Sequence, residues 1–133
     1  TPTFAGCLRN AKAVGEAAMR RGRKIAVIPA GEKWKDDGTL RPAFEDLIGA
    51  GAIISQLPGL LSPEARLAAD AFRSVSGRLL QCLTECSSGK ELKEIGFEQD
   101  ITLIAELDAD DCAPILSDGA YERASALLER ESH

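Results

Sequence analysis

The chain has 133 residues, of which 44% are apolar and 28% are charged, and its formal net charge is -5. This length suits one domain with a buried core, and this balance argues against a disordered chain. No apolar run approaches the ~20 residues that span a bilayer, and no basic and apolar leader begins the sequence. The acidic balance disfavours nucleic acid as a partner. We therefore predict a single domain over residues 1–133 that binds neither membranes nor nucleic acids.

The cysteines and the histidine limit the kinds of catalytic and metal-binding site that this chain can form. Cys7, Cys82, Cys86 and Cys112 are scattered without paired spacing, so we expect reduced thiols and a cytoplasmic location. The one histidine, His133, is the last residue, where chains are usually poorly held. We therefore expect no Ser-His-Asp triad, Cys-His dyad or His-ligated zinc site. The groups that remain available for chemistry are carboxylates, arginine, lysine, asparagine, thiols, backbone amides or a hard metal ion.

Residues 1–30 predict a strand, a helix and a second strand. Residues 3–6 are short and extended, and from Leu8 apolar residues recur at helical spacing until Gly22, which suits a helix end. Residues 24–29 are apolar on both faces, as in a parallel sheet covered by helices. A right-handed crossover would join the two strands. Because a parallel sheet needs more strands than this chain shows, we predict an α/β fold that another piece completes.

The rest of the sequence predicts more helices than strands. A polar loop over residues 30–41 leads to a helix that begins at Pro42 and ends before Pro58. The next elements are a long helix capped by Ser62, with an apolar face reaching Cys86, and a short helix opened by a capping box at residues 88–91 and stopped at Gly96. Residues 98–107 suit either a helix or a strand, and we favour a helix. A strand over 113–116 and a charged helix over 121–131 follow.

Two segments follow the predicted strands at their carboxyl ends, where open α/β sheets bind ligands. The first contains Cys7, Arg9 and Asn10: amides at a helix start favour an anion, and Arg9 adds a positive charge. A plain tight turn with asparagine in the first helical turn explains the same pattern. Cys7 is either a nucleophile activated by the helix start or a small buried residue.

The second segment begins at Gly31 and Glu32 and continues to Glu45 and Asp46 on the next helix. Mg²⁺ takes one or two carboxylates plus substrate phosphate oxygens, so carboxylates beside an anion pocket suit this ion. A solvated loop and an acidic first helical turn explain the same residues without a ligand. Trp34, alone in the polar loop, is either a lid over a ligand or a contact for another chain segment.

Two glycines, Gly49 and Gly51, stand inside the helix that follows Pro42. Each glycine costs a helix interior ~1 kcal/mol relative to alanine. We therefore expect another backbone to pack closely against this helix.

Several phrases occur together in a characteristic order. They are Cys-Leu-Arg-Asn-Ala at 7–11, Ile-Pro-Ala-Gly-Glu at 28–32, Phe-Glu-Asp-Leu-Ile-Gly-Ala-Gly-Ala-Ile at 44–53, Gly-Lys-Glu-Leu at 89–92, Gly-Phe-Glu-Gln-Asp-Ile at 96–101 and Pro-Ile-Leu at 114–116. With these phrases the sequence resembles the carboxyl-terminal half of the 2-phosphosulfolactate phosphatase (ComB) family over residues 5–119. The phrase that contains Glu-Asp is the most specific of them.

The resemblance implies a three-layer α/β/α fold with a mostly parallel sheet, only part of it contained in this chain. It also implies a Mg²⁺-dependent phosphatase that hydrolyses 2-phosphosulfolactate, or a similar small phosphoester, to sulfolactate and phosphate in coenzyme M biosynthesis. The residue pattern and the resemblance together suggest three sets of site residues. Expected catalytic residues are Glu45, Asp46 and Cys7, expected phosphate-binding residues are Arg9, Asn10 and Gly31, and expected metal ligands are Glu32, Glu45 and Asp46.

The family's amino-terminal half carries an Asp/Arg-rich segment and a Thr-Asn-Gly-Thr-like motif, and neither is in this sequence. If that half supplies metal ligands and the phosphate cradle, this chain is inactive alone. It would then need that half, or a further copy of itself, to complete the sheet. The alternative is a non-catalytic domain that binds an anion or its missing half. Loss of turnover on chelation would favour the enzyme.

Overall fold

The structure is a computed structural model, and it describes residues 1–124. Its helical elements are η1 (Leu8–Asn10), α1 (Ala11–Arg21), α2 (Phe44–Ser55), α3 (Pro63–Val75), η2 (Ser76–Arg78), α4 (Leu79–Glu85), α5 (Ser87–Glu94) and α6 (Glu98–Ile104). Its strands are β1 (Glu32–Lys33), β2 (Leu40–Arg41), β3 (Pro114–Ser117) and β4 (Ala120–Arg123). No described helix is long and apolar enough to cross a membrane.

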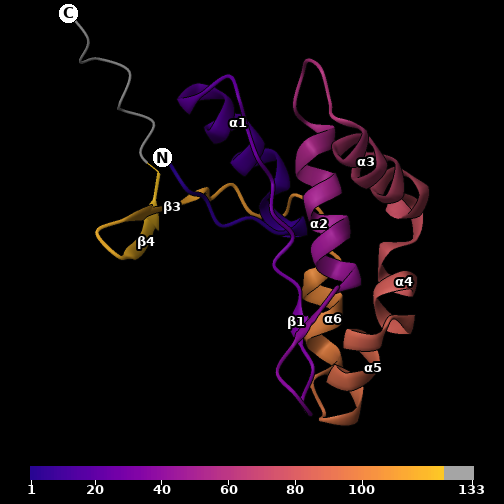
Figure 1. Cartoon of the computed structure of the whole chain (residues 1–133). Coiled ribbons are helices and arrows are strands. Elements are labelled where there is room, and N and C mark those ends of the chain that lie inside the picture. Colours follow the sequence, from indigo (N-terminus) through magenta and orange to yellow (C-terminus); the bar gives the residue numbers. More distant parts are fainter. Residues whose placement is uncertain (125–133) are drawn as a thin grey trace, which may run out of the picture.

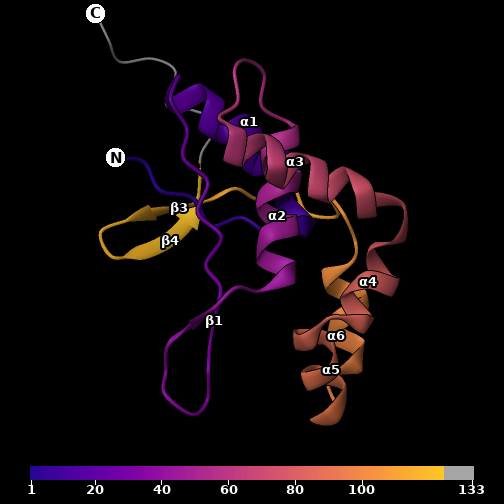
Figure 2. The same cartoon turned by 45° about the vertical axis from the view of Figure 1, so that its right-hand side comes forward.

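Helix α2 lies at the centre of the helical part (Figure 1). Helices α1 and α3 pack against it, and α4, α5 and α6 continue from α3 toward the other end of the molecule (Figure 2). Residues 48–54 of α2 are all buried, because neighbours surround this helix over most of its circumference. The main core contains Leu8, Ala11, Val14, Ala17, Ile48, Ala52, Ile53, Phe72, Val75, Leu79, Leu83, Ile101 and Ala113.

The close approach of α2 and α3 depends on one glycine. A Cβ atom at Gly51 would collide with the carbonyl oxygen of Ala68, and it would stand 2.8 Å from the Cβ atom of Phe72. Gly49 differs, because a Cβ there would meet only the backbone of Cys7 and Leu8, at 3.8 Å or more. The expected close backbone packing is therefore confirmed at Gly51, whereas the backbone that lies against Gly49 leaves room for a methyl group.

The described strands form two small antiparallel sheets, β1–β2 and β3–β4. The β3–β4 hairpin turns at Asp118 and Gly119, whose φ angles of 48° and 82° suit a tight two-residue turn. Phe4 forms an antiparallel bridge to Ile115, so the start of the chain lies against β3. The structure thus mixes helix and strand as expected, but the described residues show no parallel sheet.

Several expected elements are confirmed and others are corrected. The structure contains the helices expected before Gly22, after Pro42 and from residue 98, the last of which ends at residue 104. It also contains the strand expected near Pro114. The long helix after Ser62 is broken at η2 and again before α5, although its expected apolar face is buried down to Leu83.

Three further expectations were wrong in part. The polar loop over residues 30–41 is a hairpin, β1–β2, because Asp37-Gly38 turns the chain back on itself. The prediction of a charged helix over residues 121–131 was wrong at its start, because β4 pairs with β3 there. Residues 125–131 lie outside the described part of the chain. Residues 24–29 belong to neither sheet.

Candidate functional site

The first turn of α2 carries the carboxylates that the sequence singled out. The Oδ2 atom of Asp46 accepts a hydrogen bond from the backbone N–H of Gly31 at 2.7 Å. Asp46 therefore ties the end of the extended segment 24–29 to the helix start. Gly31 has a φ of 75°, and a Cβ there would stand 2.9 Å from the carbonyl oxygen of Arg41, so this turn requires glycine.

Glu45 stands next to Asp46 and has a different environment. Its Oε2 atom is buried and has no hydrogen-bond partner among residues 1–124. A buried carboxylate oxygen without a partner carries a desolvation cost, so such atoms in native proteins call for an explanation such as an unplaced water or ion. Glu45 is thus the carboxylate with capacity for a further ligand.

Arg41 lies beside these carboxylates and was not predicted from the sequence. Its Nη1 and Nη2 atoms donate to the two carboxylate oxygens of Glu91 at 2.9 and 3.3 Å, and its guanidinium lies 5.2 Å from the centre of the Trp34 ring. The bond to Glu91 raises the pKa of Arg41, and the charges of Glu32 and Glu45 raise it further. Arg41 is therefore the positively charged group beside the carboxylates of Glu32, Glu45 and Glu91.

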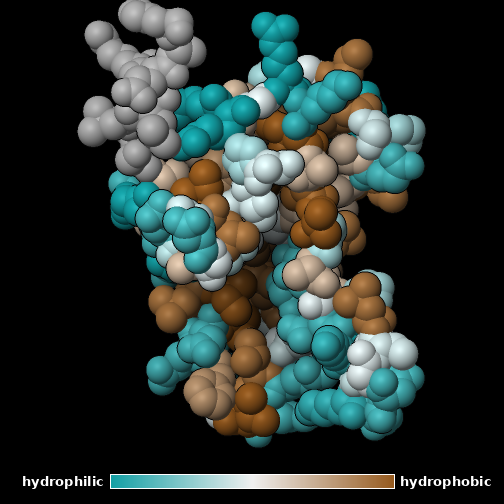
Figure 3. Space-filling model, turned by 60° about the vertical axis from the view of Figure 1, so that its left-hand side comes forward, coloured by the Kyte–Doolittle hydropathy of each residue, from teal (hydrophilic) through white to brown (hydrophobic). Residues whose placement is uncertain are grey.

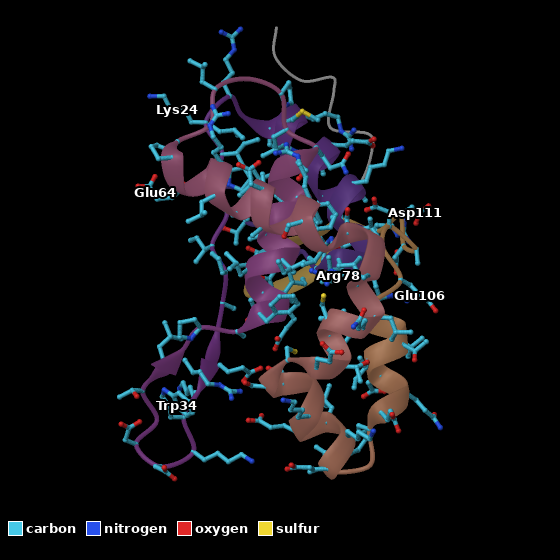
Figure 4. All side chains as sticks on the ribbon, turned by 90° about the vertical axis from the view of Figure 1, so that its right-hand side faces the viewer. Lys24, Trp34, Glu64, Arg78, Glu106 and Asp111 are labelled. Atoms are coloured by element: carbon cyan, nitrogen blue, oxygen red, sulfur yellow. The ribbon has the colours of Figure 1, made fainter. Side chains whose placement is uncertain are left out.

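The Arg41 side chain is only 12% exposed, and its Nε atom is buried with no hydrogen-bond partner in the described part of the chain. Two complementary atoms, a donor on Arg41 and an acceptor on Glu45, are therefore both buried and unpartnered at this end of α2. Figure 4 shows Trp34 on the β1–β2 hairpin, at the opposite end of the molecule from Glu64.

The predicted capping box at residues 88–91 was wrong, and this explains why Glu91 reaches Arg41. Helix α5 begins two residues earlier, with Cys86 instead of Ser88 as its cap. The Sγ atom of Cys86 accepts the N–H of Gly89 at 3.5 Å in place of a serine hydroxyl. Glu91 is thereby free to pair across the structure. No sequence signal joins Arg41 to Glu91, because they are 50 positions apart and the hairpin brings them together.

The turn before α1 holds the other predicted group, and Asn10 organises it. Asn10 is 7% exposed; its Oδ1 accepts the N–H of Cys7 at 2.8 Å. Its Nδ2 donates to the carbonyl oxygens of Cys112 at 3.0 Å and Ala5 at 3.3 Å. Each polar atom of this side chain is thus engaged within the chain. The phosphate-binding role of Asn10 stays a prediction beside this structural one.

Arg9 and Cys7 occupy the exposed side of this turn. The Nη1 atom of Arg9 donates to Glu106 Oε2 at 2.6 Å and to the carbonyl oxygen of Leu103 at 2.9 Å. Cys7 is exposed and precedes η1, and all four cysteines are free. Arg9 therefore anchors the end of α6, and its predicted contact with phosphate remains untested.

The two groups share one face of α2. Gly49, which lies against the backbone of Cys7 and Leu8, is four positions after Glu45. Residues i and i+4 lie on the same side of a helix, one turn or ~5 Å apart. The turn at Cys7 therefore lies about one helical turn from the position of Glu45 along α2. The expected meeting of the two groups at the carboxyl ends of two parallel strands stays a prediction.

The predicted metal ligands do not form a closed centre by themselves. Within residues 1–124 no group of three or more histidine, cysteine, aspartate or glutamate residues is placed to hold a metal ion. Mg²⁺ needs only one or two protein carboxylates when phosphate oxygens and water complete its shell. The unpartnered oxygen of Glu45 fits an ion shared in this way, whereas a three-ligand set with Glu32 and Asp46 does not fit.

The described residues form a protein of mixed helix and strand, in which the acidic start of α2 has the cation Arg41 beside it. The chain belongs to the 2-phosphosulpholactate phosphatase family, whose family model matches residues 1–119.

Curated relatives agree with this family. A protein of Pseudothermotoga lettingae named a probable 2-phosphosulfolactate phosphatase is 29% identical over 119 residues, which are 89% of this chain and 50% of that protein. A 2-phosphosulfolactate phosphatase of Methanothermobacter thermautotrophicus is 28% identical over 117 residues, 88% of this chain and 49% of that protein. A probable 2-phosphosulfolactate phosphatase of Gloeobacter violaceus is 34% identical over 84 residues, 63% of this chain and 34% of that protein. The chain thus spans about half the length of the first two.

Proposed function

We propose that this chain forms part of a phosphatase that hydrolyses 2-phosphosulfolactate, or a similar small phosphoester, to an alcohol and phosphate. The observation that carries the proposal is the family match over residues 1–119, which includes the predicted Glu-Asp segment at the start of α2. A purely non-catalytic domain is not favoured, because relatives named as phosphatases match close to nine-tenths of the chain.

Within this reaction we assign Glu45 to bind the attacking water, or an ion that activates it, through its unpartnered oxygen. Asp46 holds the Gly31 amide and so fixes the turn at the end of residues 24–29. Arg41 faces Glu45 and offers its free Nε to an oxygen of the anionic substrate.

We propose Mg²⁺ as the cofactor, shared between Glu45 and the substrate phosphate. A bound magnesium ion neutralises the charge that develops on phosphate oxygens.

The proposed location is the cytoplasm, and the four free cysteines support a reducing compartment.

The test is phosphate release from 2-phosphosulfolactate with Mg²⁺ and with a chelator. The chain is assayed alone and together with a complement, the half of the Pseudothermotoga lettingae relative that this chain does not match. We expect metal-dependent release in the mixture and a loss of about 100-fold or more on Glu45→Gln. Glu64→Gln is the matched control, because Glu64 occupies the same first-turn position on α3, away from the site. No release in either assay, while the intact relative is active, would contradict the proposal.

A further inference from the structure

The start of the chain lies beside β3 and runs antiparallel to it (Figure 1). Phe4 forms the bridge to Ile115, and the Ala5 N–H donates to the Pro114 carbonyl oxygen at 3.0 Å. In an antiparallel pair one strand counts up while the other counts down, so each step along the first strand meets the preceding residue of the second. The register of these two segments is therefore known, and it can be followed toward the start of η1.

This register places two cysteines opposite each other. The step after Ala5 sets Gly6 opposite Ala113, and the next step sets Cys7 opposite Cys112. Cys7 keeps the extended backbone of a strand, with a φ of −151° and a ψ of −177°. Residues directly opposite on antiparallel strands point their side chains to the same face. The fold thus brings together two cysteines that lie near opposite ends of the sequence.

Both thiols lie on the face of this strand pair that points away from the helices. Phe4 packs against the main core, and a Cβ at Gly6 would stand 2.6 Å from the Cδ1 atom of Ile53, so these alternate positions face the helices. Cys7 therefore faces outward; it is exposed, and Cys112 is partly exposed. Figure 3 views the side of the molecule that carries the β3–β4 hairpin, and hydrophilic and hydrophobic residues both reach the surface there.

Asn10 connects the backbones of the two cysteines. As described above, its Oδ1 accepts the Cys7 N–H and its Nδ2 donates to the Cys112 carbonyl oxygen. One buried carboxamide thus stands where a direct ladder hydrogen bond would join a regular pair. Opposite residues of an antiparallel pair have Cα atoms about 4.5–5.5 Å apart, within the roughly 4.4–6.8 Å that a disulfide spans. A disulfide here would replace the Asn10 bridge with a covalent one.

We propose that Cys7 and Cys112 form a reversible disulfide when the chain meets a disulfide oxidant such as oxidised glutathione. The thiolate of Cys7 attacks one sulfur of the oxidant, forms a mixed disulfide and releases one reduced thiol. The thiolate of Cys112 then attacks the Cys7 sulfur and releases the second thiol. The protein loses two electrons and two protons, and the oxidant gains them. This inference does not rest on the proposed activity.

A cation lies near the second of these thiols. Arg123 donates to Asp111 at 3.2 Å, and this bond raises the pKa of Arg123, with the charge of Cys112 adding to the effect. Thiol–disulfide exchange proceeds through the thiolate, and a nearby arginine stabilises a thiolate. The surroundings of Cys112 therefore favour the second step.

The other two cysteines provide an internal comparison. Cys82 and Cys86 lie one helical turn apart, but the Sγ atom of Cys86 donates to the Leu83 carbonyl oxygen at 3.2 Å and accepts the Gly89 N–H at 3.5 Å. This thiol is held as the cap of α5, so we expect it to remain reduced.

The experiment equilibrates the full chain with mixtures of oxidised and reduced glutathione, in buffer and in concentrated urea. After the remaining thiols are blocked, trypsin places Cys7 in residues 1–9, Cys112 in residues 94–123, and the other two cysteines together in residues 79–90. Mass spectrometry then identifies the linked peptides, and the glutathione ratio at half-oxidation gives the effective concentration of one thiol at the other. We expect this concentration to be about 100-fold higher or more in buffer, because an unfolded chain supplies ~mM or less.

Three variants assign the link. Cys7→Ser and Cys112→Ser should each abolish the link between residues 1–9 and 94–123. Cys82→Ser is the matched control and should leave this link at its original level, and dithiothreitol should return the chain to free thiols.

Three outcomes would overturn the inference. The first is an equal effective concentration in buffer and in urea, which would mean that the fold does not bring the thiols together. The second is a link from Cys7 or Cys112 to residues 79–90, or to a second chain, in place of the proposed one. The third is glutathione that stays on Cys7 while Cys112 remains a free thiol.

Discussion

The helical part and the extended segments of this chain differ in how many of their backbone hydrogen bonds are formed. Helices α1, α2 and α3 satisfy their backbone groups internally and bury a shared apolar core. The extended segments satisfy only part of theirs, in two short hairpins and a bridge at Phe4, while residues 24–29 pair with nothing described. The comparison shows that the helices form their hydrogen bonds locally, whereas residues 24–29 have no backbone partner within residues 1–124.

The largest effect expected in the helical part comes from Gly51→Ala. The added methyl group meets the Ala68 carbonyl oxygen, so α2 and α3 must separate, and we expect a loss of about 3 kcal/mol or more of unfolding free energy. Gly49→Ala in the same helix has room for its methyl and should stabilise by up to ~1 kcal/mol. Urea unfolding followed by far-ultraviolet circular dichroism measures both. Equal effects of the two substitutions would contradict the packing described for α2.

A smaller effect is expected at Asn10, which joins the two regions. Asn10→Ala leaves the Cys7 N–H and the Cys112 carbonyl without their partner, and we expect a loss of about 1–3 kcal/mol. Exchange of the Ala5 amide, which donates to Pro114, should also accelerate, because the same turn holds it.

Arg9→Ala is the control for Asn10, since its ion pair with Glu106 is partly exposed and such pairs contribute about 0–1 kcal/mol. A loss at Arg9 as large as that at Asn10 would mean that the ion pair, and not the buried amide, holds the turn.

The smallest effect is expected in acid at the tip of the β1–β2 hairpin. Asp37 accepts bonds from the Thr39 hydroxyl at 2.7 Å and the Thr39 N–H at 2.9 Å, and these bonds lower the pKa of Asp37. A lowered pKa in the folded state means that the stabilisation is present above about pH 4 and is lost as the pH falls through the folded value.

The Thr39 amide resonance, followed by nuclear magnetic resonance, should therefore shift as the pH falls below about 4 while the helical dichroism is retained. Asp37→Asn should remove that titration, and Asp36→Asn should leave it in place. Loss of helical signal in the same step would show that the hairpin and the helices unfold together.

The sequence predicts the helices well because their signals are local. Ser62 caps α3 by accepting the Ala65 N–H, and Pro63 occupies its first position, as expected. The break at η2 was missed because the apolar face continues through it to Leu83. Strand β4 was missed because its charged residues suit a solvated helix equally, although Asp118-Gly119 is a hairpin signal.

Only the local part of the candidate site can be inferred from the sequence, and its function stays a prediction. Glu45 and Asp46 follow from an acidic helix start, which is a local pattern, and the turn at Cys7 reaches the same helix face. The pairing of Arg41 with Glu91 depends on a hairpin and on the placement of α5, and no periodicity encodes it. The engagement of Arg9 with Glu106, 97 positions away, has the same origin.

The stacking of Arg41 on Trp34 also gives the molecule an optical reporter. Trp34 is the only tryptophan, is 52% exposed and sits on the hairpin instead of in the helical core. Its fluorescence therefore follows the contact of the hairpin with α5 and says little about the core. An unfolding curve recorded by emission records release of the hairpin, so it need not coincide with one recorded by helix content.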